Sequence, residues 1–271
     1  MKKTILITGA STGIGKVTAI HFAKNGWNVA ATMRSPEKDT ELKNISGIKI
    51  FKLDVMDQAS IDGAIQSTIK EFGKIDVLFN NAGYALIGAF EAMTEAQIKR
   101  QFDTNVFGVM NVTRSILPHF RERKDGTIIT TSSMGGRLTF PLYSAYHGTK
   151  FAIEGFMESL QFELKPFNIK VKNIEPGAIK TDFYSRSIEI ATMKPYEKYI
   201  EIANGNMMKV GETAPGPQVV AEKVFTASTD GKFKLRYPVG NNAPALLFMR
   251  WLLPLKMFMG IVRSQVEKGM K

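Results

Sequence analysis

The chain of 271 residues contains no cysteine and only three histidines. The absence of cysteine excludes disulfides, thiolate catalysis and cysteine-based metal sites. His21, His119 and His147 do not have the spacing of metal ligands, so we expect no metal site. A chain without cysteine suits a reducing compartment, and the expected location is therefore the cytoplasm.

Acidic residues are fewer than basic ones, 25 against 36, which gives a formal net charge of +11. Such a balance can favour nucleic acid or an anionic membrane surface as a partner. The basic residues are scattered along the chain, however, and no nucleic-acid-binding motif is present. We expect no nucleic-acid partner, whereas a basic protein does suit an anionic cofactor.

Long uninterrupted hydrophobic runs are also absent. The apolar stretch at residues 4–7 is too short for the core of a signal peptide, and Gly9 breaks the pattern that follows it. Near the other end of the chain, Arg250, Pro254 and Lys256 interrupt an apolar stretch. These interruptions argue against a membrane-spanning helix.

Short apolar runs alternate with longer segments of helical periodicity. The sequence predicts strands over residues 4–8, 28–33, 48–53, 75–79, 126–131, 169–174 and 234–237. It predicts helices over residues 15–25, 60–72, 95–122, 143–164 and 218–226. This alternation predicts an α/β fold, a doubly wound Rossmann-type parallel sheet of seven strands with helices on both faces. No linker or repeat divides residues 1–271, so we expect a single domain.

A glycine-rich turn follows the first predicted strand and opens the first predicted helix. Glycines permit a tight turn and let backbone amides approach a pyrophosphate at a helix N-terminus. A serine and a threonine in the turn add hydroxyl donors. The residues predicted to cradle the cofactor phosphates are Gly9, Ser11, Thr12, Gly13, Ile14 and Gly15.

The end of the second predicted strand bears on the choice between NAD and NADP. A carboxylate about 20 residues beyond the glycine turn would bind the ribose 2′-hydroxyl of NAD. The chain has Arg34 and Ser35 there instead, and a guanidinium beside a hydroxyl suits a 2′-phosphate. Thr12 weakens this case slightly, because a basic residue at that position would have been a second phosphate partner. The sequence favours NADP(H) over NAD(H).

Tyr146 and Lys150 are four residues apart, which places them one turn apart on the same face of a helix. A nearby ammonium favours the phenolate of a tyrosine, whose ordinary pKa is about 10. Such a tyrosine can donate or accept a proton near neutral pH. Ser133 lies upstream, where a second hydroxyl could hold the same substrate oxygen.

Together with further motifs, these features resemble the short-chain dehydrogenase/reductase family, in particular its hydroxysteroid and retinol dehydrogenases, over about residues 3–182. The resemblance implies that Ser133 is the catalytic serine, because of its spacing from Tyr146, and that the adjacent Ser132 is structural. Asn105 would kink its helix and hold a water in the proton relay. The implied catalytic set is Asn105, Ser133, Tyr146 and Lys150.

The resemblance also implies contacts along the whole dinucleotide. Asp54 and Val55 would meet the adenine, and Tyr146 and Lys150 would lie against the nicotinamide ribose. The residues implied at the adenosine ribose are Asn81, Ala82 and Gly83, and those implied at the nicotinamide end are Pro176, Gly177, Ile179 and Thr181.

Two apolar segments are candidates for covering the substrate. Residues 178–215, which include Phe183 and Tyr184, are predicted to form a lid. Residues 241–271 form an apolar C-terminal extension that could cover the cleft, form an oligomer interface or, less favoured, touch a membrane surface. Both segments favour a lipophilic substrate, although simple packing against the sheet explains the lid equally well.

The sequence therefore predicts an NADP(H)-dependent oxidoreductase that interconverts a carbonyl and an alcohol, with Tyr146 as general acid and base. One alternative is an NAD-dependent alcohol dehydrogenase. Another, less favoured, is a non-catalytic dinucleotide-binding regulatory protein, which the intact catalytic set argues against. The family resemblance implies a homodimer or homotetramer built on the helices that carry Asn105 and Tyr146.

Overall fold

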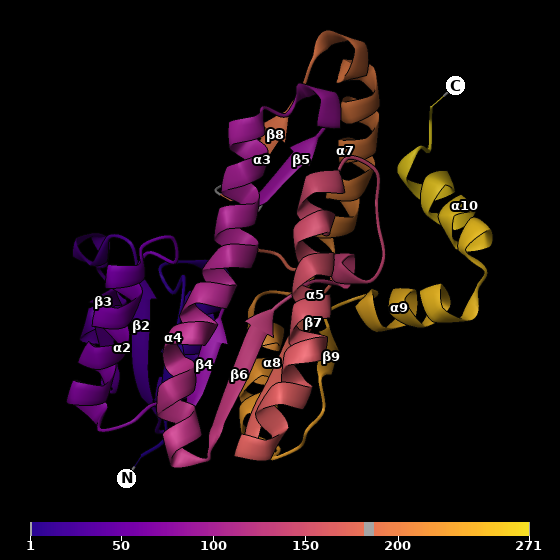
Figure 1. Ribbon diagram of the computed structural model, residues 1–271. Helices are drawn as coiled ribbons and strands as arrows, with labels where there is room; N and C mark the ends of the chain where they lie inside the picture. Colours follow the sequence, from indigo (N-terminus) through magenta and orange to yellow (C-terminus); the bar gives the residue numbers. More distant parts are fainter. Residues whose placement is uncertain (1, 182–186, 271) are drawn as a thin grey trace.

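A seven-stranded sheet forms the centre of the protein in the computed structural model, which describes residues 2–181 and 187–270 (Figure 1). All neighbouring strands pair in parallel, in the order β3-β2-β1-β4-β6-β7-β9. The arrangement confirms the predicted doubly wound sheet. The strands are β1 (Thr4–Ile7), β2 (Asn28–Met33), β3 (Ile48–Lys52), β4 (Val77–Asn80), β6 (Gly126–Thr131), β7 (Ile169–Pro176) and β9 (Arg236–Val239).

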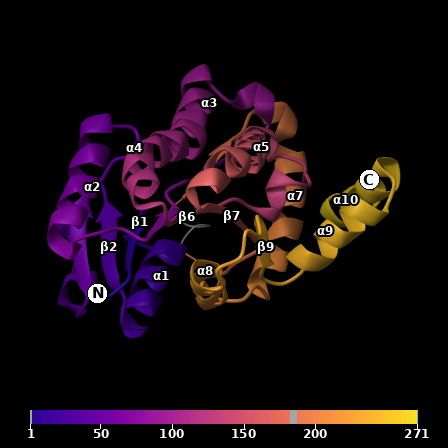
Figure 2. The ribbon, with the colours of Figure 1, turned by 60° about the horizontal axis from the view of Figure 1, so that its bottom comes forward.

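Helices cover both faces of this sheet, as Figure 2 shows. Alternate side chains of β1 point to opposite faces, so Ile5 and Ile7 join one hydrophobic cluster and Leu6 joins the other. Strands buried on both sides need apolar residues on both sides, which is why these strands read as continuous apolar runs. One face carries α1 (Gly13–Lys24) and α8 (Gln218–Thr229), and the other carries α2 (Gln58–Phe72), α4 (Gly108–Arg123) and α5 (Ser144–Leu164).

The long helix expected over residues 95–122 is divided by a π-helical turn. Its first part is α3 (Glu95–Phe102), which begins at a capping box between Thr94 and Gln97. The π-helical turn spans Asp103–Phe107 and leads directly into α4. Turns of this kind occur frequently at functional sites, and this one contains Asn105.

A second, two-stranded parallel sheet was not predicted. It pairs β5 (Ala85–Gly88) with β8 (Ile188–Ala191), which belongs to the predicted lid. Helix α7 (Glu197–Glu212) follows within the same segment. Phe183 and Tyr184 lie outside the described residues.

Short turns connect these elements. The 3-10 turns are Pro36–Lys38, Leu42–Asn44, Phe90–Ala92, Met134–Gly136, Lys165–Phe167 and Lys194–Tyr196. The loop ahead of α5 contains Leu142, whose φ of 69° lies in the left-handed region. The Leu142 carbonyl accepts a hydrogen bond of 2.7 Å from the amide of Gly88 in β5.

The C-terminal extension forms two helices that project from the body beside β9 (Figures 1 and 2). They are α9 (Ala243–Leu252) and α10 (Leu255–Val266). One side of each packs in a separate hydrophobic cluster with α7 and with the residues that follow Ser133. Within the described ranges, no helix combines the length and the apolar character needed to cross a bilayer.

Candidate active site

The carboxyl ends of β1, β4, β6 and β7 bring most of the predicted site residues to one edge of the sheet. Strand β1 leads into the glycine turn, β4 into Asn81, β6 into Ser132 and Ser133, and β7 into Gly177. This edge of a doubly wound sheet is where ligands bind in such folds.

The glycine turn packs closely against neighbouring backbone. Gly9 has a φ of 66°, and a Cβ there would lie 2.8 Å from the Cα of Ala82. A Cβ on Gly15 would lie 2.3 Å from the carbonyl oxygen of Gly9, so neither position tolerates a side chain. Thr12 makes no side-chain cap to α1 among the described residues, and the first turn of this helix has no acidic residue. The backbone amides of this first turn and the helix dipole therefore suit an anionic group.

Asn81 ties three strand ends together. Its side-chain amide donates hydrogen bonds to the carbonyl oxygens of Thr8 (3.1 Å) and Gly9 (3.2 Å). Its Oδ1 accepts a hydrogen bond from the Thr131 hydroxyl at 3.3 Å. The backbone amides of Asn81 and Ala82 both donate to the Thr8 hydroxyl. Asn81 thereby holds the glycine turn against the end of β6, as a structural clamp.

Lys150 lies beside Tyr146 on α5 and is buried, with 8% of its surface exposed. Its Nζ donates a hydrogen bond of 2.9 Å to the Thr131 carbonyl oxygen and lies 5.7 Å from the centroid of the Tyr146 ring. Burial lowers the pKa of Lys150 to about 8, and the Glu154 carboxylate opposes this shift. The lysine is still mainly protonated at neutral pH, so an ammonium stands next to the tyrosine.

The two neighbouring serines have different surroundings. The Oγ of Ser133 accepts a hydrogen bond of 3.0 Å from the Gly135 amide, which leaves the hydroxyl proton able to bind another oxygen. Ser132 is buried, and its amide donates to the Ile174 carbonyl oxygen at 2.8 Å. Within the described residues, the Ser132 Oγ has no hydrogen-bond partner.

Asn105 is almost fully buried in the π-helical turn. Its Oδ1 accepts from the Tyr84 amide at 3.1 Å, and its Nδ2 donates to the Tyr84 carbonyl oxygen at 2.9 Å. The Nδ2 group also donates to the Thr149 hydroxyl of α5 at 3.3 Å. A Cβ on Gly83 would lie 3.1 Å from the Asn105 Oδ1, a tighter contact than most Cβ atoms make. Asn105 fixes the position of α5 relative to the segment after β4.

The residues predicted at the two ends of the cofactor lie at different places along the sheet edge. Ile179 is buried and lies against Gly240. Thr181 lies close to the glycine turn, since a Cβ added to Gly13 would be 3.8 Å from its side chain. Pro176 ends β7, and the Gly177 amide donates to the Val239 carbonyl oxygen at 2.9 Å.

Arg34 and Ser35 follow β2, while Asp54 and Val55 follow β3 at the outer end of the sheet. Arg34 is exposed, and it forms no ion pair within the part of the chain that the structure describes. The Asp54 Oδ1 accepts a hydrogen bond of 3.0 Å from the Met56 amide, and Val55 is buried.

His147 is a site neighbour whose role was not predicted. It is buried, its ring stacks on Tyr143, and its Nδ1 accepts a hydrogen bond of 3.3 Å from the Phe140 amide. Burial lowers the pKa of His147 to about 4, so the ring is neutral at physiological pH. A neutral ring can accept from Phe140, and it thereby anchors the loop ahead of α5.

Two buried carboxyl groups lie behind Lys150. Glu154 is one turn further along α5, and its Oε2 accepts a hydrogen bond of 3.0 Å from Arg236 Nε. Glu175 in β7 is completely buried, and its Oε1 lies 3.4 Å from the same nitrogen without a hydrogen bond. Burial and the nearby Glu154 raise the pKa of Glu175 to about 7, while Arg137 and Arg236 oppose the shift. Sequence gave no signal for this pair.

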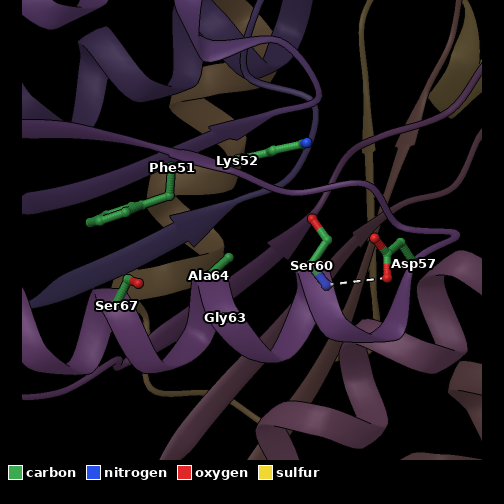
Figure 3. A pocket seen from close by; sticks show the side chains of 7 residues that line it. All are labelled: Phe51, Lys52, Asp57, Ser60, Gly63, Ala64 and Ser67. Atoms are coloured by element: carbon green, nitrogen blue, oxygen red, sulfur yellow. Dashed lines mark hydrogen bonds between the residues drawn. The ribbon is translucent and has the colours of Figure 1, made fainter.

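A surface hollow of about 340 Å³ lies between β3 and α2 (Figure 3). Asp57 beside it accepts a hydrogen bond from the Ser60 amide and so caps α2. The hollow contains none of the predicted catalytic residues. It is lined by Phe51, Lys52, Asp57, Ser60, Gly63, Ala64 and Ser67.

Comparison with known proteins identifies the family. The chain matches the short chain dehydrogenase family over residues 3–189. The uncharacterized oxidoreductase YusZ of Bacillus subtilis is 36% identical over 278 residues, covering 98% of this chain and 99% of that protein. A 3-ketodihydrosphingosine reductase of Bacteroides thetaiotaomicron is 41% identical over 179 residues, covering 66% of this chain and 65% of that protein.

Solved structures agree with this match. A short-chain dehydrogenase from Streptomyces avermitilis has a TM-score of 0.82 and 33% identity, with full coverage of both chains. ElxO with NADP bound has a TM-score of 0.76 and 27% identity, covering 90% of this chain and all of that one. A 3-ketoacyl-(acyl-carrier-protein) reductase from Brucella melitensis, complexed with NADH, has a TM-score of 0.74 and 26% identity, covering 89% and 98%. The protein is an oxidoreductase of the short-chain dehydrogenase family.

Proposed function

We propose that the protein is an NADP(H)-dependent oxidoreductase that interconverts a carbonyl and an alcohol on a lipophilic substrate, with Tyr146 as general acid and base. The observation that carries this proposal is the buried Lys150 ammonium beside the Tyr146 ring, held there by the Thr131 carbonyl. A positive charge at this position stabilises the phenolate and lowers the energy of proton transfer.

Each proposed catalytic residue has its own role in the reaction. The bound cofactor would supply or accept the hydride. In the reductive direction, Tyr146 donates its proton to the carbonyl oxygen, and the Ser133 hydroxyl donates a hydrogen bond to the same atom. Lys150 stabilises the resulting phenolate. Asn105 holds a water in the proton relay and, through its hydrogen bond to Thr149, keeps α5 at a fixed distance from the segment after β4.

The preference for NADP(H) rests on Arg34. Arg34 is exposed directly after the end of β2. Strand β2 lies next to β1, the strand that leads into the glycine turn. A 2′-phosphate offers the charge and the acceptors that a guanidinium binds best. Similar structures contain NADP or NADH, so the family fold alone does not decide between them.

The lipophilic substrate is supported by two observations. The cluster under the C-terminal helices includes Met134, which follows Ser133 directly, and Leu142, which precedes α5. The relative from Bacteroides thetaiotaomicron is named for the reduction of 3-ketodihydrosphingosine, a long-chain ketone. Apolar side chains next to the catalytic serine would suit a substrate of this class.

Titration of the purified protein with NADPH and NADH tests the cofactor assignment. We expect NADPH to bind at least about tenfold more tightly, and Arg34→Glu to weaken NADPH binding by roughly 10–100-fold because it removes a charge-assisted hydrogen bond. NADH binding should change far less. Lys38→Glu is the matched control, since Lys38 is also exposed on the segment after β2.

Two other outcomes of the nucleotide titration would contradict the proposal. Equal or tighter NADH binding by the wild type would remove the NADP(H) assignment and favour an NAD-dependent alcohol dehydrogenase. Failure to bind either nucleotide would overturn the enzymatic proposal in favour of a non-catalytic role. With NADPH binding established, turnover is measured on long-chain ketones and aldehydes, with short-chain analogues as controls for the apolar preference.

A further inference from the structure

The outer side of the two C-terminal helices exposes a compact group of large apolar side chains. Trp251 is 74% exposed, and Phe248, Leu252 and Leu255 are each more than half exposed. Phe248, Trp251 and Leu252 have the three- and four-residue spacing of one face of α9. Leu255 is the first residue of α10, just beyond the break between the two helices. The Phe248 and Trp251 rings are in contact, with centroids 5.9 Å apart. We call this group the apolar corner, and residues 243–270 the C-terminal arm.

The arm does not need the apolar corner for its own packing. Its inner side is buried through Leu247 in α9 and through Phe258, Val262 and Val266 in α10. The last three recur every four residues, which gives α10 a single buried stripe. The arm is therefore anchored from within, and its exposed group remains available to a partner.

The C-terminal arm carries an excess of positive charge. The arm carries Arg250, Lys256, Arg263 and Lys268 against the single acid Glu267, a net charge of +3 from four basic residues and one acidic residue. Glu267 is engaged in an ion pair of 2.6 Å with Arg263. Lys256 is exposed in the first turn of α10, next to Leu255 of the apolar corner.

This charge distribution decides between two occupants of the surface. A second copy packed symmetrically on the apolar corner would bring the same patch, and therefore the same excess of positive charge, against itself. An anionic lipid surface is complementary to it, and basic residues beside exposed aromatic and aliphatic side chains are typical of helices that lie in a membrane interface. Tryptophan in particular suits the headgroup region, because its ring is amphipathic.

We propose that the C-terminal arm docks the protein on an anionic lipid surface, with Phe248, Trp251 and Leu252 in the interface and Lys256 against the headgroups. The proposal does not depend on the cofactor or the substrate. It does add a consequence, because the inner side of the arm packs in the same cluster as Met134, next to Ser133. A docked arm would hold the catalytic edge close to the bilayer from which an apolar substrate could enter.

Tryptophan fluorescence provides a direct test. The chain has two tryptophans, of which Trp27 is buried and Trp251 is exposed, so a vesicle-dependent blue shift would report on Trp251. We expect the shift and co-sedimentation with phosphatidylcholine vesicles that contain phosphatidylglycerol, and little of either with phosphatidylcholine alone. High salt should reduce binding, because it screens the lysine and arginine charges.

Variants distinguish the contributions. Trp251→Ser combined with Leu252→Ser should abolish co-sedimentation, and Lys256→Glu should weaken binding to the anionic vesicles by roughly tenfold. Phe233→Ser is the matched control, since Phe233 is 49% exposed but precedes β9, whereas the arm follows that strand. Its vesicle binding should equal that of the wild type. Circular dichroism and NADPH affinity, measured for every variant, show whether the fold is kept.

Two results would overturn the proposal. One is equal binding of the wild type and of the Trp251→Ser, Leu252→Ser variant to anionic vesicles. The other is a wild-type protein that binds neither kind of vesicle but forms a dimer in sedimentation velocity, while the double variant forms no dimer. That result would assign the apolar corner to a second copy of the chain. Neither result bears on turnover in solution, so the docking proposal and the proposed function fail independently.

Discussion

The sheet edge that carries the proposed catalytic residues and the C-terminal arm differ in how their side chains are held. At the edge, Asn81, Asn105 and Lys150 are each bound to backbone carbonyl groups of other elements. On the arm, Trp251 and Phe248 are exposed to solvent. Internal hydrogen bonds fix the first region, so its positions are constrained by folding and chemistry together. The outer side of the arm is not constrained by folding, and its composition therefore points to a partner.

Tyr146→Phe should have the largest effect on the catalytic side of this comparison. Turnover should fall by about a thousandfold, because a positioned general acid is lost, while NADPH affinity stays close to that of the wild type. Steady-state kinetics and nucleotide titration measure the two quantities. Tyr143→Phe, which removes a neighbouring hydroxyl, is the control and should lose far less activity. Wild-type turnover in Tyr146→Phe would refute the mechanism.

The adjacent serines allow a sharper comparison within the edge itself. Ser133→Ala should lower kcat by about a hundredfold, because it removes a donor to the developing oxyanion. Ser132→Ala should leave kcat nearly unchanged and should not reduce thermal stability, since it removes a buried hydroxyl without a hydrogen-bond partner in the described structure. If both variants lost activity equally, the assignment of Ser133 alone would be wrong.

Glu175→Gln tests the buried charge behind Lys150 through the pH dependence of stability. The pKa of Glu175 is raised from 4.5 to about 7 in the folded protein, so the folded state binds the extra proton between these values. The stability contributed by this group is present below about pH 4.5 and is lost as the pH rises through about 7. The variant should therefore gain on the order of 2 kcal/mol relative to the wild type between about pH 5 and pH 8.

Urea unfolding of the variant and the wild type at about pH 5 and about pH 8 measures this change in the free energy of unfolding. The buried His147 has the opposite linkage, because its folded pKa is lowered and its contribution grows as the pH rises from about 4 to 6.5. It is present in both proteins, so it cancels in the comparison. An unchanged difference between the variant and the wild type at both pH values would contradict a raised pKa at Glu175.

The sequence was sufficient for the central sheet and for the placement of the glycine turn, Tyr146 and Lys150. These features depend on local apolar runs and on short spacings, which a single chain displays directly. The small β5–β8 sheet was missed because it pairs Ala85 with Ile188, and no local pattern records a contact over such a separation. Periodicity predicted one helix over residues 95–122 and did not reveal its π-helical turn, whereas the family resemblance did imply a kink at Asn105.

The buried acid pair was missed for a different reason. Glutamate on a helix or strand is usually exposed, so nothing in the sequence distinguishes Glu154 or Glu175 from a solvated residue. Their burial depends on Arg137 and Arg236, which come from distant parts of the chain. Likewise, the apolar residues of the extension could be read as a cover, an interface or a membrane contact until the structure separated the inner side from the outer side.

Leu142 stores conformational strain at a junction of the molecule. A leucine in the left-handed region costs about 1–2 kcal/mol, which its surroundings must compensate. Its carbonyl is held by Gly88, and its side chain packs in the cluster under the C-terminal arm. Contacts from β5 and from the cluster under the arm thus hold Leu142 in its unfavourable conformation just ahead of α5. Loss of either contact would let the backbone ahead of Tyr146 relax.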